Sequence, residues 1–201
     1  MKKKLSLIII SLGIAVILIL VFVNQSAKAD FAGEFLGQKE FIQNIDGKNH
    51  NFEIKTYKNG MDFHSYLIED RFLNSNYIEL TGFEDNVLPC QNNPVQLGGD
   101  LGEAICLINV VGAHSQNLML IQYQNGNFSD INFSTPERTG KNITSDVPNM
   151  IFKDFDNDGN IDLAVDNRNY DLDPISSAIR SYYSCSKEGF IFDRSENITY
   201  N

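Results

Sequence analysis

The sequence lacks the short motifs of several common enzyme classes. It contains no tryptophan, only three histidines and only three cysteines. A glycine-rich phosphate loop, a Cys-x-x-Cys pair and a His-Glu-x-x-His sequence are missing, which argues against nucleotide-phosphate, thiol-redox and helical zinc chemistry. His114 and Ser115 are neighbours, but no Gly-x-Ser-x-Gly surrounds the serine, and adjacent strand residues point to opposite faces. We therefore expect a protein that is not an enzyme.

Basic side chains are also scarce. The chain has 16 lysine and arginine residues against 26 aspartate and glutamate residues. Lys2, Lys3, Lys4 and Lys28 precede residue 30, so the remainder has 16 − 4 = 12 basic residues and a net charge of 12 − 26 = −14. Nucleic acids are bound through basic patches, so we do not expect them as partners. The acidic balance suits a protein that works with divalent cations.

The first 29 residues have the features of an export segment. Three lysines precede Leu5–Val23, an uncharged run of 19 residues that is long enough for a transmembrane helix with its N-terminus in the cytoplasm. Ala27-Lys28-Ala29 also has the small-x-small form of a signal peptidase site, with Asp30 as the first mature residue. Both alternatives, a single-pass membrane anchor and secretion after cleavage, place residues 30–201 outside the cytoplasm.

Residues 30–201 contain no long segment with a helical period, and we expect one all-β domain of antiparallel sheets. Asp46-Gly47, Asn59-Gly60 and Asn125-Gly126 are hairpin signals between apolar stretches. The expected strands are 34–45, 51–57, 61–69, 77–81, 104–111, 117–124, 127–133, 149–153, 161–166, 178–185 and 190–193. Residues 134–146 are expected to form a polar connection.

One stretch, residues 154–165, concentrates acidic side chains. Carboxylates crowded around a tight turn repel each other, and a hard divalent cation such as Ca²⁺ removes that repulsion by accepting six to eight oxygens. We expect the ligands to be the side chains of Asp154, Asp156, Asp158 and Asp162, the main-chain carbonyl of Asn160, and water. Gly159 suits the sharp bend of such a loop. The alternative is an ordinary solvated acidic turn without an ion.

The loop differs from an EF-hand. An EF-hand needs a glutamate at loop position 12 and a helix on each side, whereas position 12 is Val165 and the flanking runs favour strands. A loop between two strands, with its last acidic residue at position 9, resembles the calcium loop of FG-GAP (VCBS-like) repeats. Such repeats build the β-propeller heads of integrin α-subunits and of many bacterial surface proteins.

The resemblance implies propeller-blade-like sheets in about three units. These are residues 149–193, residues 77–133 and the hairpins of residues 34–69. Closed propellers have four to eight blades, so we expect an incomplete or open array, or one that closes by self-association. Asp100 and Glu103 precede an apolar strand of the second unit and are candidates for a second, degenerate calcium loop.

The three cysteines suit an oxidising compartment. Cys90 and Cys106 flank a loop that contains Pro94 and several glycines, and we expect a disulfide between them. Cys185 is then left over. It is either a half-buried strand cysteine or one that forms a bridge to another chain.

These features favour a calcium-binding module in adhesion or recognition, with a protein or glycan at the cell surface as its partner. Tyr170, Tyr182 and Tyr183 are near the acidic loop in sequence and could line a ligand surface, as in integrin-like heads. The alternative is a secreted or surface hydrolase of polysaccharides in which the loop is only structural. It would require convergent groups such as those of Glu69, Asp70 and His114.

Overall fold

The structure is a computed structural model that describes residues 31–69, 71, 76–83, 85–99, 101–111, 115–146, 149–172 and 176–200. The regular secondary structure of these residues consists of strands in three sheets. Among them there is no helix long and apolar enough to cross a membrane. The expected N-terminal helix and the boundary at residue 29 lie outside the described residues.

Sheet 1 is an antiparallel meander in the order β1-β2-β3-β4. Its strands are β1 (Glu34–Ile45), β2 (Lys48–Asn59), β3 (Asp62–Glu69) and β4 (Asn76–Glu79). Asp46 and Gly47 turn the first hairpin with φ angles of 52° and 73°, in the left-handed region that Asp-Gly tolerates. The strand expected at residues 77–81 therefore completes sheet 1 and does not begin the second unit.

Sheet 2 has the order β12-β8-β7-β5, with β6 also pairing with β7 and β9 also pairing with β8. Its strands are β5 (Val87–Pro89), β6 (Val95–Gly98), β7 (Gly102–Val111), β8 (Ser115–Gln124), β9 (Asn127–Asp130) and β12 (Asn142–Ser145). The two long central strands thus have two short partners each. Strands β5, β6 and β12 were not expected from the sequence.

Sheet 3 has the order β11-β10-β16-β15-β14-β13. Its strands are β10 (Phe133–Ser134), β11 (Thr139–Gly140), β13 (Met150–Lys153), β14 (Asp162–Arg168), β15 (Ser177–Ser186) and β16 (Gly189–Thr199). β13 to β16 form an antiparallel meander, and β10 adds to β16 in parallel. Residues 134–146 are therefore not a plain connection, because β10 and β11 join the outer edge of sheet 3.

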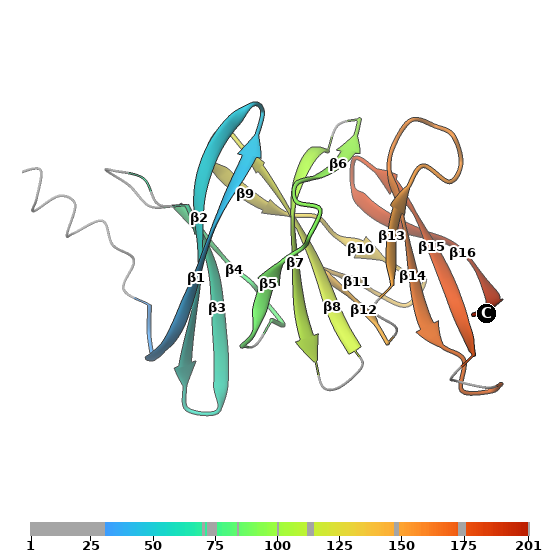
Figure 1. Ribbon diagram of the computed structural model, residues 1–201, viewed down its shortest axis with the longest axis horizontal. Helices are drawn as coiled ribbons and strands as arrows, with labels where there is room; N and C mark the ends of the chain where they lie inside the picture. The colour runs from blue at the N-terminus through green and yellow to red at the C-terminus, as the bar shows by residue number, and fades with distance from the viewer. Residues whose placement is uncertain are drawn as a thin grey trace, which may run out of the picture.

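The three sheets stand side by side with sheet 2 in the middle (Figure 1). Both faces of sheet 2 are buried. Ala104, Cys106, Leu118 and Leu120 pack toward sheet 3, and the alternating residues Ile105, Leu107, Met119 and Ile121 pack toward sheet 1. Strands buried on both faces have continuous apolar runs, which explains the Ile-Cys-Leu-Ile and Leu-Met-Leu-Ile sequences of β7 and β8.

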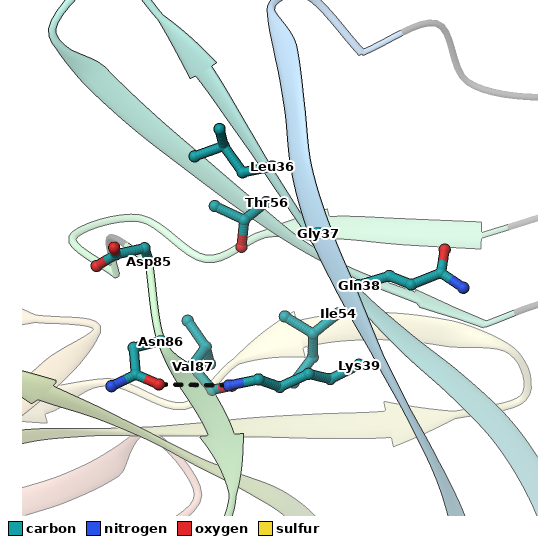
Figure 2. Close-up of a pocket in the computed structure, with 9 residues that line it drawn as sticks. All are labelled: Leu36, Gly37, Gln38, Lys39, Ile54, Thr56, Asp85, Asn86 and Val87. Atoms are coloured by element: carbon teal, nitrogen blue, oxygen red, sulfur yellow. Dashed lines mark hydrogen bonds between the residues drawn. The ribbon is translucent and has the colours of Figure 1, made fainter.

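Sheets 1 and 2 are also joined by a polar contact beside a groove of about 250 Å³. The Lys39 Nζ donates to the main-chain oxygen of Val87 at 3.1 Å and to the Asn86 side chain at 3.4 Å. Figure 2 shows the Lys39 side chain crossing from β1 to the segment that leads into β5.

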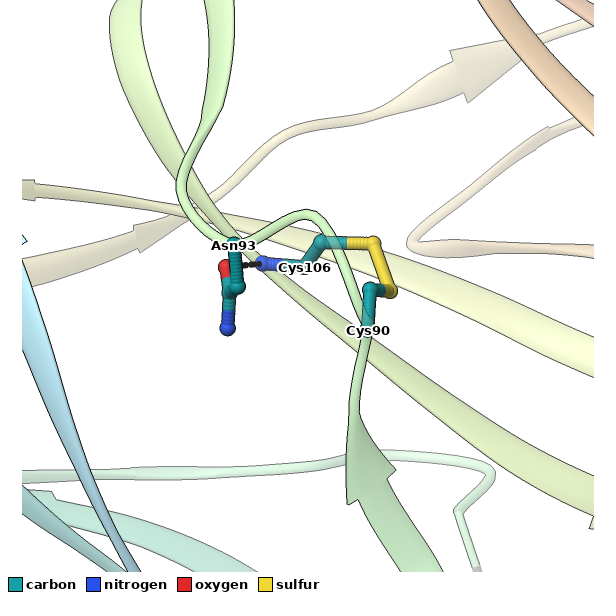
Figure 3. The surroundings of a disulfide bond; sticks show 3 residues. All are labelled: Cys90, Asn93 and Cys106. Carbon is teal, nitrogen blue, oxygen red and sulfur yellow. Dashed lines mark hydrogen bonds between the residues drawn. A yellow bond between two sulfur atoms is a disulfide. The ribbon is translucent and has the colours of Figure 1, made fainter.

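The expected disulfide between Cys90 and Cys106 is confirmed, with a Cα–Cα distance of 5.4 Å. It joins the end of β5 to the middle of β7 (Figure 3). The Cys106 N–H donates to the Asn93 side chain at 2.9 Å, so the loop between the two cysteines folds back on β7. Cys185 is free and buried in the core between sheets 2 and 3.

Candidate metal centre

The acidic loop joins β13 to β14 at one end of sheet 3. Lys153 and Asp162 are paired in the register of these strands, so the two ends of the loop, Asp154 and Asp162, begin side by side. Inside the loop, Asn157 and Gly159 have φ angles of 64° and 91°. The two left-handed residues reverse the chain twice within a few residues, which makes the loop compact.

Three of the four predicted carboxylates converge. One oxygen each from Asp154, Asp156 and Asp162 lies within 4.8 Å of the others. Asp158 is not part of this group. Its two oxygens accept hydrogen bonds from the main-chain and side-chain amides of Asn160, at 2.7 and 2.9 Å. The Asn160 carbonyl and the Asp158 side chain remain predicted ligands.

Main-chain amides hold the converging carboxylates in place. The two oxygens of Asp154 accept from the N–H groups of Asn157 and Gly159, at 2.6 and 3.1 Å. Asp156 accepts from the N–H of Asp158 at 3.0 Å. Each carboxylate oxygen has two lone pairs, so an oxygen that accepts one hydrogen bond can still bind a cation.

Asp162 is the anchor of the loop. Its side chain is buried, and its two oxygens accept from the N–H groups of Phe155 at 3.0 Å and Cys185 at 2.9 Å. These bonds connect the start of the loop, its end and the adjacent strand β15. Burial and the nearby carboxylates of Asp162 and Asp158 raise the pKa of the Cys185 thiol to about 11. Cys185 is therefore a protonated core residue rather than a reactive thiolate.

The electrostatics of the loop match a cation site. Hydrogen bonds from Asn160 lower the pKa of Asp158 below its ordinary value. The hydrogen bond from the Asp158 amide also lowers the pKa of Asp156, but desolvation and repulsion by Asp162, Asp158 and Asp154 outweigh it and raise that pKa. The loop thus gathers negative charge that its own hydrogen bonds do not neutralise. The converging donors are all carboxylate oxygens, the ligands that Ca²⁺ prefers.

The acidic loop also contacts sheet 2 through strand β6. The Ile161 N–H donates to the main-chain oxygen of Leu97 in β6 at 2.8 Å. Gly98 and Gly99 follow. A Cβ at Gly98 would lie only 3.0 Å from the Gly159 carbonyl oxygen, and one at Gly99 would collide with the Asn160 side chain. The Gly-Gly pair is visible in the sequence, but only the structure shows that it lies against the acidic loop.

Glu103 makes other contacts. Its oxygens accept from the Asp46 N–H at 2.8 Å and from the Gln96 side chain at 2.6 Å. It therefore joins the first hairpin of sheet 1 to the β6–β7 turn. Asp100 lies outside the described residues, so the second calcium loop stays a prediction.

Of the groups considered for hydrolysis, Asp70 and His114 lie outside the described residues. Glu69 is buried. One of its carboxylate oxygens lies 2.8 Å from His50 Nδ1, within hydrogen-bond distance, and the carboxylate also pairs with Arg71. Burial raises the pKa of Glu69, but hydrogen bonds from Tyr123, His50 and Arg71 outweigh this effect and lower it. An ionised carboxylate clamped by several donors is suited to joining sheets 1 and 2.

The three tyrosines near the loop in sequence do not share a surface. Tyr170 is exposed, and Tyr183 is buried between sheets 2 and 3. Tyr182 faces the opposite side of sheet 3, where its ring meets that of Phe155 from the acidic loop at a centroid distance of 5.0 Å. Tyr182 is therefore a direct neighbour of the loop.

Comparison with known proteins assigns no family to the chain. No protein-family model, curated protein sequence or solved structure matches it. A proposal about its function therefore rests on its own residues.

Proposed function

We propose that the protein is a non-enzymatic, calcium-binding β module that acts in adhesion or recognition outside the cytoplasm. The convergence of the Asp154, Asp156 and Asp162 carboxylates within 4.8 Å carries this proposal. Three carboxylates so close together are costly without a counter-charge, and Ca²⁺ accepts oxygen ligands in flexible geometries. The further ligands would be Asp158, Asn160 and water.

The role of the ion in this proposal is structural. It would hold the β13–β14 turn closed and, through Asp162 and Ile161, fix the contacts of the loop with β15 and β6. An ion that binds only the folded chain stabilises it by about 2.7 kcal/mol at a hundredfold excess over Kd. Outside the cytoplasm the Ca²⁺ concentration is high enough to occupy a site of low affinity, as in other extracellular calcium modules.

The sheets support a propeller-like interpretation of the fold. Sheet 1 and the β13–β16 part of sheet 3 are four-stranded antiparallel meanders. Sheet 2 resembles such a meander in which each outer strand is replaced by two short strands, β5 and β6 beside β7, and β9 and β12 beside β8. The three follow one another in sequence and in space (Figure 1). The metal loop joins the first two strands of the third unit. This is the position that the FG-GAP resemblance implies.

Recognition is favoured over hydrolysis by the surroundings of Glu69. Its carboxylate is engaged by His50 and Arg71 and has a lowered pKa, whereas a general acid needs a raised one. The partner would be a protein or glycan at the cell surface.

The proposal is tested by calorimetric titration of the full-length protein with CaCl₂ in a mild detergent. We expect binding to one site with a Kd of about 10⁻⁴ to 10⁻³ M, the range of extracellular calcium modules. The double variant Asp154→Asn, Asp156→Asn should lose it. Asp62→Asn, an exposed change in sheet 1, is the control and should bind like wild type. Equal binding by the double variant would refute the site.

A further inference from the structure

The row of sheets has two different ends along the direction of its strands. At one end, the Ile161 N–H of the acidic loop donates to Leu97 in β6 at 2.8 Å. The Asp46 N–H of the β1–β2 turn donates to Glu103 in β7 at 2.8 Å. These contacts gather one end of each sheet, called the acidic end below. The β2–β3 turn and the ends of β7 and β14 point the opposite way, toward the lower edge of the view (Figure 1).

The opposite end, called the apolar end below, exposes large hydrophobic side chains on all three sheets. They are Phe35, Leu36 and Met61 in sheet 1, Val110 and Val111 in β7, and Tyr170 and Leu172 after β14. Met61 is 91% exposed and Tyr170 71%. The other exposed large hydrophobic residues of the described chain lie elsewhere on sheets 1 and 3, and they are Ile42, Tyr77 and Ile191. Single exposed apolar residues are ordinary, whereas a group of them at one end marks an interaction surface.

Hydrogen bonds hold sheets 2 and 3 together at the apolar end. The Ser115 hydroxyl donates to the Asp146 carboxylate at 3.2 Å, and the Asp146 N–H donates to the Asn167 side chain of β14 at 2.9 Å. Val111 is paired with Ser115, and Tyr170 follows Asn167 by three residues. The exposed apolar residues of these two sheets therefore belong to one surface.

The chain enters the domain at the apolar end. Glu34, the first residue of β1, is opposite Lys58, which lies next to the β2–β3 turn. Gly33 packs on the same segment, since a Cβ there would lie 2.6 Å from the Lys58 carbonyl oxygen. In the sequence, seven residues separate the uncharged run Leu5–Val23 from Phe31. Seven residues span at most about 25 Å, so a membrane anchor formed by this run would keep the apolar end close to the bilayer.

The charges near the apolar end indicate the kind of lipid that it fits. Its charged side chains are mostly carboxylates, those of Glu34, Asp62, Asp85 and Asp171, against the cations of Lys58 and Arg168. An excess of carboxylates is repelled by anionic lipid headgroups. The apolar end therefore fits a surface of zwitterionic lipids.

We propose that the apolar end lies on the bilayer that Leu5–Val23 spans, with the tips of the three sheets in the headgroup region and the acidic loop pointing away from the membrane. The proposal takes the membrane-anchor alternative for the export segment, and it does not depend on Ca²⁺ binding. Aromatic and large aliphatic side chains are the residues that enter membrane interfaces.

The arrangement of the exposed side chains favours lipid over a protein partner. They come from the separate tips of three sheets and do not form one continuous apolar face. A fluid lipid surface accommodates separate tips, whereas a protein partner would need a complementary shape. The covalent connection to Leu5–Val23 also brings the bilayer within reach of this end.

The test uses the absence of tryptophan from the chain. The full-length variants Met61→Trp and Tyr170→Trp each place one fluorophore at the apolar end, in sheets 1 and 3. Ile42→Trp is the matched control. Ile42 is also an exposed apolar residue, 69% accessible, but it lies seven residues beyond Phe35 in β1, about 23 Å along the strand. Each variant is reconstituted in phosphatidylcholine vesicles with and without bromine atoms on the acyl chains, which quench a nearby indole.

Brominated lipid should lower the emission of Met61→Trp and Tyr170→Trp at least about twofold, because interfacial side chains enter the boundary of headgroups and acyl chains by about 5–10 Å. The emission of Ile42→Trp should not change. In Tyr170→Trp with the added changes Met61→Asp and Val111→Asp, the quenching should decrease, because the other two sheets lose apolar contacts with the lipid.

Quenching at Met61→Trp and Tyr170→Trp that is no stronger than at Ile42→Trp would overturn the proposal, and would mean that water or protein covers this end. Undiminished quenching after the two aspartate changes would also overturn it. An intact mass of the membrane-extracted protein that shows cleavage after Ala29 would do the same, because the anchor would be absent. The acidic loop is at the other end of the sheets, so each of these results would leave the metal site standing.

Discussion

The Asp162 carboxylate accepts a hydrogen bond from the Cys185 N–H at 2.9 Å, which joins the end of the acidic loop to the neighbouring strand. The other oxygen of Asp162 accepts from Phe155 at 3.0 Å. One buried side chain thus belongs both to the candidate metal site and to the sheet. Asp156, by contrast, is exposed and accepts a hydrogen bond from the Asp158 N–H within the loop.

This difference predicts separate effects for two aspartates. Asp162→Ala should lower the free energy of unfolding by about 3 kcal/mol even with a chelator present, because it leaves two amides without their charged acceptor. Asp156→Ala should cost less than about 0.5 kcal/mol in chelator, as surface changes do, and should act only when Ca²⁺ is added. Urea unfolding in both conditions measures these effects. Equal losses for the two variants in chelator would contradict the anchoring role of Asp162.

The contact of the loop with sheet 2 is tested at two glycines of the β6–β7 turn. Gly99 and Gly102 both have positive φ angles, 50° and 58°, but a methyl group at Gly99 would collide with Asn160, whereas one at Gly102 would meet open space. Both alanine variants should lose about 1 kcal/mol or more from backbone strain. Gly99→Ala should lose more than Gly102→Ala and should also bind Ca²⁺ more weakly. Calorimetric titration of the two variants checks this, and equal affinities would show that the glycine contact does not shape the loop.

An element of the fold can be predicted from the sequence when a local stretch of residues is long or distinctive enough to determine it. The Asp46-Gly47 and Asn125-Gly126 turns were predictable because their local chemistry determines the hairpin. The two-residue strands β10 and β11 have too few residues to show a period, and their pairing with β16 is a long-range contact. For the same reason the expectation that residues 77–81 begin the second unit is wrong, because β4 pairs with β3 in sheet 1.

In the candidate site too, local features could be predicted from the sequence and long-range contacts could not. Spacing within one loop predicted that aspartates would gather, and Asp154, Asp156 and Asp162 do so. Spacing could not show that Asn160 engages Asp158, because an amide and a cation compete for the same oxygens. The supporting contacts of Leu97 and Gly99 come from another sheet and have no local signal.

A buried ion pair in sheet 3 predicts the response of the domain to acid. Burial raises the pKa of Asp166, but hydrogen bonds from Arg180, Tyr200 and Asn149 outweigh it, so the pKa lies below its ordinary value of 3.8. A lowered folded-state pKa gives stability that is complete above the unfolded value and is lost as the pH falls through the folded one. Wild-type stability should therefore decrease below about pH 4, and this part of the decrease should be absent in Asp166→Asn.

At neutral pH, Asp166→Asn should cost about 3 kcal/mol, because it leaves the partly buried Arg180 without its counter-charge. Asp193→Asn is the matched control. Its pair with Arg194 is exposed, and such pairs contribute less than about 1 kcal/mol. Urea unfolding between pH 3 and 7 compares the variants. A similar cost for both would contradict a structural role for the buried pair.

We infer that the loop of residues 154–162 is a structural Ca²⁺ site. The most direct measurement is the melting temperature of the full-length protein in a mild detergent, with millimolar Ca²⁺ and with a chelator, for wild type and for Asp154→Asn, Asp156→Asn. Ca²⁺ should raise Tm in wild type alone, since only the intact loop gathers the three carboxylates. An equal Tm of wild type in Ca²⁺ and in chelator, or an equal rise in the variant, would contradict the claim.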